Sequence, residues 1–311
     1  MNIDLSIIIV NYNSWHYLKP CLESVYKNFT KISFEIIVVD NASTDNSQNL
    51  ITQHFPEIIF SENKENAGFS KANNQAIKIA RGKYFFLLNA DTLILNSHIN
   101  KALNYLEKHP SIGILGTQQQ NGNRKTVTSF SFDRNISEYQ KSMLLDALYL
   151  NKFNKKGNIL SNQILSVGYV NGAAMIIRRE LIKKIGVLDE RYFFMAEEVD
   201  FAFRCHTAGY EVVYFPEFKV LHYGASGKGL TLWGLMQYHY SNFKLFKKFG
   251  HSEFSAGIIF ILWLITRTIY SLISMLVFKE SIVNYSRIKL YLKAMIWYLS
   301  LGRLKFSITY K

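Results

Sequence analysis

The sequence predicts an α/β fold in which a mostly parallel sheet is flanked by helices, followed by a hydrophobic, basic helical extension. In the first hundred residues, short apolar runs alternate with amphipathic helical patterns, which is the arrangement of βαβ units. A later apolar stretch, 254–278, contains a single charged residue, Arg267. The 311 residues are 49% hydrophobic with only 4 Pro and 17 Gly, which indicates a globular core and excludes a low-complexity chain.

The individual elements follow in chain order. Strands are predicted at 5–10, 34–39, 58–61 and 84–88, each an apolar run ended by polar or breaking residues. Pro20 fits best in a first helical turn, so the first helix is predicted to begin near Lys19. The second helix is predicted to begin after the capping residues Ser43, Thr44 and Asp45, and the third covers 71–80.

Polar clusters stand at three strand ends: Asn11-Tyr12-Asn13, Asp40-Asn41 and Asn89-Ala90-Asp91. Ligands of open α/β sheets gather outside the carboxyl ends of the strands, which places Asp91 where chemistry occurs. A lone carboxylate there suits a divalent cation that holds a diphosphate, and the alternative is a carboxylate that caps a helix. No G-x-G-x-x-G follows the first strand, which disfavours a dinucleotide fold.

Four segments resemble glycosyltransferase family 2, and its bacterial rhamnosyltransferase-like members in particular. They are I-I-I-V-N-Y-N (7–13), V-V-D-N-A-S-T-D (38–45), N-A-G-F-S-K-A-N-N (66–74) and F-L-L-N-A-D (86–91). Each segment is weak alone, but four in order at suitable spacing are specific. The resemblance implies a GT-A fold, a nucleotide-diphospho-sugar donor with dTDP-rhamnose as one candidate, and Mg²⁺ or Mn²⁺.

The resemblance also assigns roles to the residues of the first half. Tyr12 is expected against the nucleotide and Asp40 at the base or ribose, although Asp40 could simply cap a helix and Gly68 could simply form a turn. Asn89-Ala90-Asp91 takes the place of the family's metal-binding D-x-D, so that Asp91 carries most of the predicted metal site. The predicted donor-binding residues are Tyr12, Asn13, Asp40, Asn41, Asn66, Gly68, Asn73, Asn89 and Gly172.

A cluster of acids, Glu197, Glu198 and Asp200, is expected at the start of a helix that ends near Thr207. The positive field of a helix N-terminus favours an ionised carboxylate, as a general base requires, and the alternative is ordinary capping. By the resemblance Glu198 is the catalytic base, with Glu197 and Asp200 in support. The family pattern is Glu-Asp-x-Asp, so Glu198 is a departure that adds one methylene.

Three further segments complete the predicted catalytic domain. Residues 117–163 are polar and aperiodic, which is typical of a lid or a mobile insertion. An edge strand is predicted at 211–215. After it, His222 begins a segment that resembles the family's H-x-x-G-x-S, so His222 is expected at the metal or diphosphate unless it is structural. The loop 224–229 is expected to close over the donor.

The C-terminal quarter is predicted to form amphipathic helices on a membrane surface. The stretch 254–278 is long enough to span a bilayer, but basic residues flank it on both sides and Arg267 lies near its middle. We therefore expect a peripheral location on the cytoplasmic face of the cell membrane, bound to anionic lipid. The alternatives are one spanning helix, or a helical pair packed on the catalytic domain or on a second subunit.

The predicted organisation is a catalytic domain at 1–250, with a nucleotide-binding half (1–115) and an acceptor half (116–250), and membrane-associating helices at 251–311. The predicted function is that of an inverting glycosyltransferase that moves one sugar to a lipid-linked or cell-surface glycan. The alternative is a catalytically silent scaffold protein that binds sugar nucleotides. Nucleic acid is not an expected partner, because it accounts for the net charge of +13 but not for the acids at the strand ends.

Overall fold

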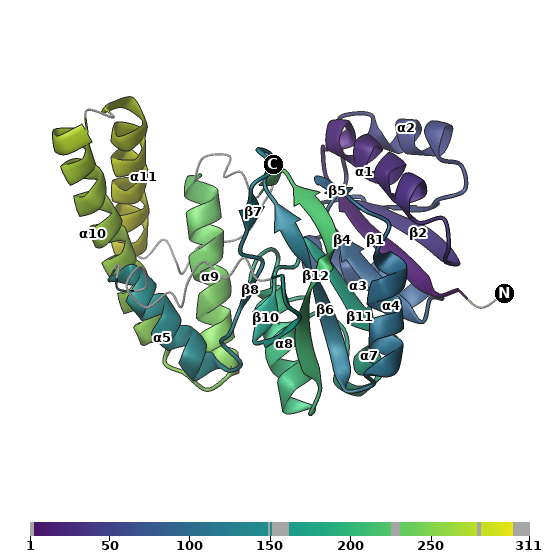
Figure 1. The fold of residues 1–311 in the computed structure, drawn as a ribbon. Helices are drawn as coiled ribbons and strands as arrows, with labels where there is room; N and C mark the ends of the chain where they lie inside the picture. The colour runs from purple at the N-terminus through teal and green to yellow at the C-terminus, as the bar shows by residue number, and fades with distance from the viewer. Residues whose placement is uncertain (1–2, 149, 151–161, 225–230, 279–280, 301–311) are drawn as a thin grey trace. The chain divides into compact units, whose positions relative to one another are not determined.

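The computed structural model describes residues 3–148, 150, 162–224, 231–278 and 281–300 (Figure 1). The chain divides into two compact units. Unit 1 comprises Met1–Arg134, Asn158–Phe193 and Glu197–Lys228, and unit 2 comprises Asn135–Gly157, Phe194–Ala196 and Gly229–Lys311. Each unit has its own core, so the two are described separately.

The sheet of unit 1 is mostly parallel, as predicted. Its main path runs in the order β3-β2-β1-β4-β11-β6-β12-β5, and of these strands β11 and β5 run antiparallel to their neighbours. Two short strands extend the sheet, β7 (Thr126–Val127) on β6 and β9 (Leu165–Val167) on β12, while β8 (Phe130–Ser131) pairs with β10 (Tyr169–Val170). The path strands are β1 (Leu5–Asn11), β2 (Phe34–Asp40), β3 (Ile59–Glu62), β4 (Tyr84–Leu88), β5 (Thr92–Ile94), β6 (Ile112–Gln120), β11 (Ala174–Arg178) and β12 (Glu211–His222).

Helices cover both faces of this sheet, because successive strand residues point to opposite sides. In β1, Ile7 and Ile9 pack with the helices of one layer, whereas Ile8 packs with the other. The first layer contains α1 (Trp15–Asn28), α2 (Ser47–His54) and α4 (Ile99–Lys108). The second contains α3 (Phe69–Ile79), α7 (Arg179–Ile185) and α8 (Glu197–Thr207). Cys21 and Cys205 are buried free thiols, one in each layer.

The strand register brings the predicted polar clusters to one edge of the sheet. Asn11 pairs with Asp40 across the last rung of the parallel β1–β2 ladder. β4 is parallel to β1, so Asn89 follows it at the same carboxyl edge. The last residue of β12, His222, pairs with Thr92 of β5 and arrives beside Asp91.

Three element boundaries differ from the sequence prediction. Helix α1 begins at Trp15 rather than near Lys19, and Pro20 lies inside it, because the buried face of the helix outweighs the one backbone hydrogen bond that a proline cannot make. Helix α2 begins only at Ser47, after Asn46 adopts a left-handed φ of +63°. The strand predicted at the edge is the long β12, which pairs with β6 on one side and with β5 and β9 on the other.

The segment 117–163, predicted as a lid or a mobile insertion, contains regular secondary structure in its described part. Strand β6 continues to Gln120, where its residues pair with β7 and β12. Helix α5 (Ile136–Ala147) follows, and the Asn135 side chain caps it by accepting a hydrogen bond from the Glu138 amide. Residues 151–161 lie outside the described part of the chain, as does the predicted donor-closing loop beyond Gly224 up to residue 229.

Unit 2 is helical, and in Figure 1 helices α10 and α11 form an antiparallel pair beside α5 and α9. The helices are α5, α9 (Leu232–Lys248), α10 (Glu253–Phe278) and α11 (Ser281–Leu299). A small core joins α9 to the pair through Leu235, Phe260, Leu264, Tyr291, Ala294 and Tyr298. Both α5 and α9 lie within the range 116–250 and belong to unit 2. Among the described helices, α10 alone is long and apolar enough to cross a bilayer by length and composition.

Candidate active site

The first part of the site is a fully buried network between the ends of β1 and β2. The Asn11 side chain donates to Asp40 Oδ2 at 2.7 Å and to Ser43 Oγ at 3.1 Å, and the Ser43 amide donates to Asp40 Oδ1 at 2.8 Å. The Asp40 carboxylate therefore accepts hydrogen bonds from other residues of the chain, and these bonds fix the loop after β2. The Asn13 amide also donates to Ser43 Oγ, at 2.8 Å, which holds Asn13 in a left-handed conformation (φ +49°). Tyr12, between these residues, is half-buried at the rim of the network.

The turn before α3 is tied to this network by Asn41. Its side-chain amide donates to the Gly68 carbonyl at 3.2 Å, and its Oδ1 accepts from Asn63 at 2.8 Å. Asn66 accepts a hydrogen bond from the Gly68 amide at 3.0 Å, so it shapes the same turn. Asn73 is buried and donates to the Phe69 carbonyl at 2.9 Å, inside the first turns of α3.

Gly68 is required at its position by conformation and by space. Its φ is +84°, and a Cβ there would lie 2.7 Å from the Phe193 ring and 2.8 Å from the Phe193 carbonyl oxygen. The Phe69 amide donates to that same carbonyl at 2.7 Å. The glycine turn thus packs directly on the segment that leads towards α8.

The second part of the site is the pair of Asp91 and His222. Asp91 Oδ1 lies 3.4 Å from His222 Nε2, and Asp91 Oδ2 accepts a hydrogen bond from the Gly224 amide at 2.9 Å. Burial raises the pKa of the Asp91 carboxyl, but the hydrogen bond and charge of His222, with the Gly224 amide, outweigh it, so that the pKa lies below its ordinary value of 3.8. Asp91 is therefore ionised at neutral pH, although its side chain is only 27% exposed.

The side-chain oxygen and nitrogen atoms at this edge of the sheet are suitable ligands for a divalent cation. Asp91 offers a carboxylate and His222 an imidazole, and Asn89 Oδ1 is a buried oxygen with no hydrogen-bond partner in the structure. Carboxylate and amide oxygens suit Mg²⁺ and Mn²⁺, which complete their shells with phosphate and water. The described residues contain no cluster of three or more His, Cys, Asp or Glu side chains. A cation here would thus depend on donor phosphate for much of its coordination.

The third part of the site consists of the acids of α8. It is linked to Asn89 through the two residues that precede β11. The Asn89 amide donates to the Ala173 carbonyl at 2.9 Å. The neighbouring residue is Gly172, where a Cβ would lie 3.4 Å from Glu198 Cβ and 3.8 Å from Glu197 Oε1. A short chain of contacts therefore leads from Asn89 to Glu198, and the predicted metal residues and the predicted base lie on the same side of unit 1.

Glu197 and Glu198 form a carboxyl pair. Glu197 is buried, and the loss of hydration, the charge of Glu198 and a hydrogen bond between the two side chains raise its pKa well above 4.5. Two neighbouring carboxylates at a buried site retain one proton between them. The raised pKa favours the proton on Glu197, which is the more deeply buried member of the pair.

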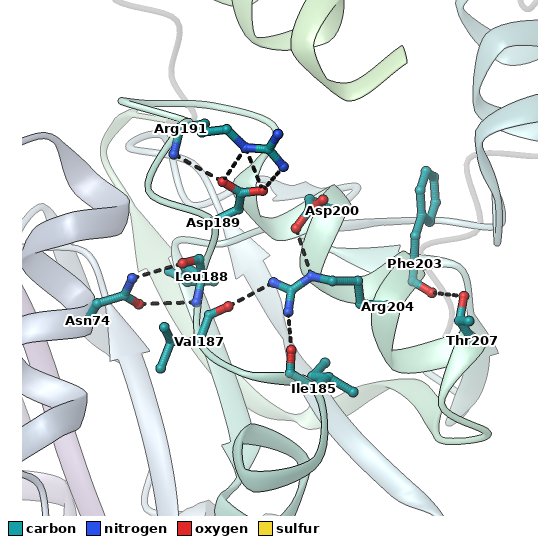
Figure 2. Close-up of polar contacts among 10 residues, drawn as sticks. All are labelled: Asn74, Ile185, Val187, Leu188, Asp189, Arg191, Asp200, Phe203, Arg204 and Thr207. Atoms are coloured by element: carbon teal, nitrogen blue, oxygen red, sulfur yellow. Dashed lines mark hydrogen bonds and ion pairs between the residues drawn. The ribbon is translucent and has the colours of Figure 1, made fainter. Parts of the chain in front are cut away.

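Asp200 does not face this pair, although it is in the same helical turn. It is fully buried and accepts a hydrogen bond from Arg204 Nε at 2.9 Å (Figure 2). Arg204 also donates to the carbonyls of Ile185 and Val187, at 2.7 and 2.9 Å. Asp200 thus supports the site by holding α8 against the loop after α7.

Some residues of the site were not identified from the sequence. Ser43 was predicted only as a helix cap, Gly224 only as part of a mobile loop, and Phe193 and Arg204 were not singled out at all. Their contacts join positions that are far apart in the chain, such as Gly224 with Asp91. The local signal for Gly224 was the run H-Y-G-A-S that begins at His222, in which one residue separates the histidine from the glycine.

The fold is that of the GT-A glycosyltransferases. A mannosyltransferase from Pyrobaculum calidifontis, solved with GDP-mannose and Mn²⁺, matches 96% of this chain and 88% of its own with a TM-score of 0.59 and 14% identity. Residues 1–349 of TarS from S. aureus, solved with UDP, match 97% of this chain and 82% of their own with a TM-score of 0.53 and 18% identity.

The chain belongs to glycosyl transferase family 2, whose sequence model matches residues 6–186. An N-acetylglucosaminyl-diphospho-decaprenol L-rhamnosyltransferase of Mycobacterium tuberculosis is 23% identical over 80% of this chain and 85% of its own length. An uncharacterised glycosyltransferase of Methanocaldococcus jannaschii is 33% identical over 36% of this chain, and the match spans 40% of that relative.

Proposed function

We propose that this protein is an inverting, metal-dependent glycosyltransferase that moves one sugar from a nucleotide-diphosphate donor to a lipid-linked or cell-surface glycan. The observation that carries the proposal is the link between the two halves of the site. Asn89 bonds to Ala173, and the adjacent Gly172 lies against Glu198, which supports Glu198 as a base near the Asp91–His222 pair.

In the proposed mechanism Glu198 removes the proton from an acceptor hydroxyl group. The hydroxyl oxygen attacks the anomeric carbon in line, and the bond from that carbon to the diphosphate oxygen breaks, which inverts the configuration. Glu197 keeps its own proton and hydrogen-bonds Glu198, which orients the ionised carboxylate. Asp91, His222 and Asn89 would hold the cation, which when bound would supply positive charge to stabilise the nucleoside diphosphate.

The comparisons support a choice of substrates to test first. The mycobacterial relative is named as an L-rhamnosyltransferase that acts on a diphospho-decaprenol, so dTDP-rhamnose and a polyprenyl-diphosphate sugar are the first donor and acceptor. UDP- and GDP-linked sugars follow, because the TarS and mannosyltransferase structures contain such nucleotides.

The decisive experiment compares Glu198→Gln with the wild-type protein. Glutamine keeps the size of the side chain but cannot accept a proton, so transfer should fall by about 10²–10⁴-fold while the Kd for the donor stays within about twofold. Glu180→Gln is the matched control, since Glu180 is an exposed acid in the first turn of α7. Unimpaired transfer by Glu198→Gln would remove Glu198 from the role of base.

A second measurement separates an enzyme from a silent scaffold. The wild-type protein should consume the donor with Mn²⁺ or Mg²⁺, and a chelator should stop the reaction. Donor binding without any consumption, across the three nucleotide classes and with the acceptor present, would favour the scaffold and contradict the proposal.

A further inference from the structure

Helix α10 presents a continuous apolar face that no described part of the chain covers. Its large exposed side chains recur every three, four or seven residues, which places them on one side of the helix. We call this surface the outer face of α10; it consists of Phe254, Ile258, Ile265, Ile269, Ile273 and Leu276. The exposed fraction rises to 84% at Leu276, near the end of the helix.

The other sides of α10 are packed against the rest of unit 2. Phe260 and Leu264 are buried in the core with Tyr291 of α11. Next to them, the Thr266 hydroxyl donates to the Ala147 carbonyl of α5 at 2.6 Å. The packed sides of α10 are thus covered by α5, α9 and α11, and the outer face is the side that stays exposed.

The contacts of Arg267 argue against α10 as a membrane-spanning helix. Its guanidinium donates to Asp146 Oδ2 at 3.0 Å, and the Trp263 indole donates to the same oxygen at 3.1 Å. These contacts fix the middle of α10 to α5, whose Glu138 and Lys141 are exposed. A spanning α10 would pull those charges into hydrocarbon, which is strongly unfavourable.

The charged side chains that α11 exposes are basic. Arg287, Lys289 and Lys293 are exposed on α11, and no acidic residue occurs in 281–300. Exposed apolar residues of α11, Leu292 and Ile296, lie among them. A second copy of this chain docked symmetrically would bring like charges together, whereas anionic lipid complements the basic residues and the apolar face at once.

We propose that the outer face of α10 and the basic side of α11 bind the surface of an anionic bilayer. The apolar side chains enter the boundary between headgroups and acyl chains, and the exposed rings of Tyr270 and Tyr285 lie at headgroup level. Lys289 and Lys293, which are four residues apart and so lie on one side of α11, contact lipid phosphates. This inference rests on unit 2 alone and is independent of the proposed catalysis.

The test is flotation of the full chain with vesicles of phosphatidylcholine, with or without phosphatidylglycerol. The protein should float with the anionic vesicles, and Ile269→Glu/Ile273→Glu should lower its partition coefficient by at least about tenfold, because a charge enters the apolar boundary. Ile79→Glu is the matched control: Ile79 is 49% exposed, against 50% for Ile269, but it lies in unit 1.

Lys289→Glu/Lys293→Glu should weaken binding to anionic vesicles by about fivefold or more per site, with a smaller effect on neutral ones.

Four results would overturn the proposal. The wild-type protein could stay unbound with both vesicle types, or Ile79→Glu could weaken binding as much as the α10 variant. Light scattering could reveal a dimer that Ile269→Glu/Ile273→Glu dissociates without any vesicle binding by the wild type, in which case a second copy covers the face. Resistance to carbonate extraction from cell membranes would show a spanning helix. Donor consumption by the α10 variant should equal that of the wild type, so a failure here is distinct from a failure of the catalytic proposal.

Discussion

At the scale of single residues, Gly224 fits against Asp91 and His222 because it has no side chain. A Cβ there would lie 2.8 Å from Asp91 Oδ2 and 3.0 Å from His222 Nε2. We expect Gly224→Ala to displace both side chains and to weaken Mn²⁺ binding by about tenfold or more, as changes around metal ligands do. The free Mn²⁺ signal in electron paramagnetic resonance measures this directly, with a nucleoside diphosphate present.

Gly209→Ala is the control for this substitution. Gly209 has a φ of +81° and open space where a Cβ would lie, so the variant should lose stability without losing Mn²⁺ affinity. Equal Mn²⁺ affinity in Gly224→Ala and the wild type would show that Gly224 does not support the site.

The carboxyl pair makes a second residue-scale prediction, on stability against pH. The folded-state pKa of Glu197 is raised above 4.5, so the stability that its proton confers is complete below that value and is lost as pH rises through the folded pKa. Glu197→Gln imitates the protonated acid at every pH. Relative to the wild type, this variant should therefore gain stability as pH rises from 5 to 8 in chemical denaturation. A stability difference that is constant over this range would contradict the assignment of the proton.

These residues also show how much of the site the sequence could predict. Polar residues at parallel strand ends must meet at one edge, so Asp40 and Asp91 were predictable as neighbours of a common site. The proton of Glu197 and the internal bonding of Asp40 depend on burial and on partners such as Asn11 and Ser43, which a linear pattern does not contain.

At the scale of elements, Arg204 binds α8 to the end of α7 and to the loop after it, through the carbonyls of Ile185 and Val187 (Figure 2). Asp200 is fully buried, so Arg204→Met would leave an uncompensated charge and lose two bonds to backbone carbonyls. We expect the free energy of unfolding to fall by about 3–5 kcal/mol, as for other buried pairs that lose one partner. Asp200→Asn in the same chain should recover part of this loss, because the buried charge is then removed.

Arg191→Met provides the matched comparison, since Arg191 pairs with Asp189 nearby but its side chain is 63% exposed. Exposed pairs contribute at most about 1 kcal/mol, so this variant should differ little from the wild type in urea denaturation. Similar losses in both arginine variants would mean that the Asp200–Arg204 pair has no special role.

The elements themselves were predicted better than their ends. The early strands lie within a residue or two of the apolar runs that predicted them, because both faces of these strands are covered by helices. Tertiary packing determines where elements end and which strands are neighbours. Helix α1 continues past Pro20 because one of its faces is buried, and β12 is an interior strand because it lies between β6 and β5. Helix α5 was missed because its pattern is weak, and it packs on α10, over a hundred residues away.

At the scale of the whole molecule, the two units should respond to different ligands. The proposed donor and metal sites are confined to residues of unit 1, and the outer face of α10 is confined to unit 2. With donor nucleotide and Mn²⁺, amide hydrogen exchange should slow around Asn66–Phe69, the β4–β5 turn and the end of β12, because a bound ligand suppresses local opening. Anionic vesicles should instead slow exchange in α10 and α11. Hydrogen-exchange mass spectrometry of one sample with each ligand in turn measures both effects, and protection of α10 by the donor alone would show that the two functions share one site.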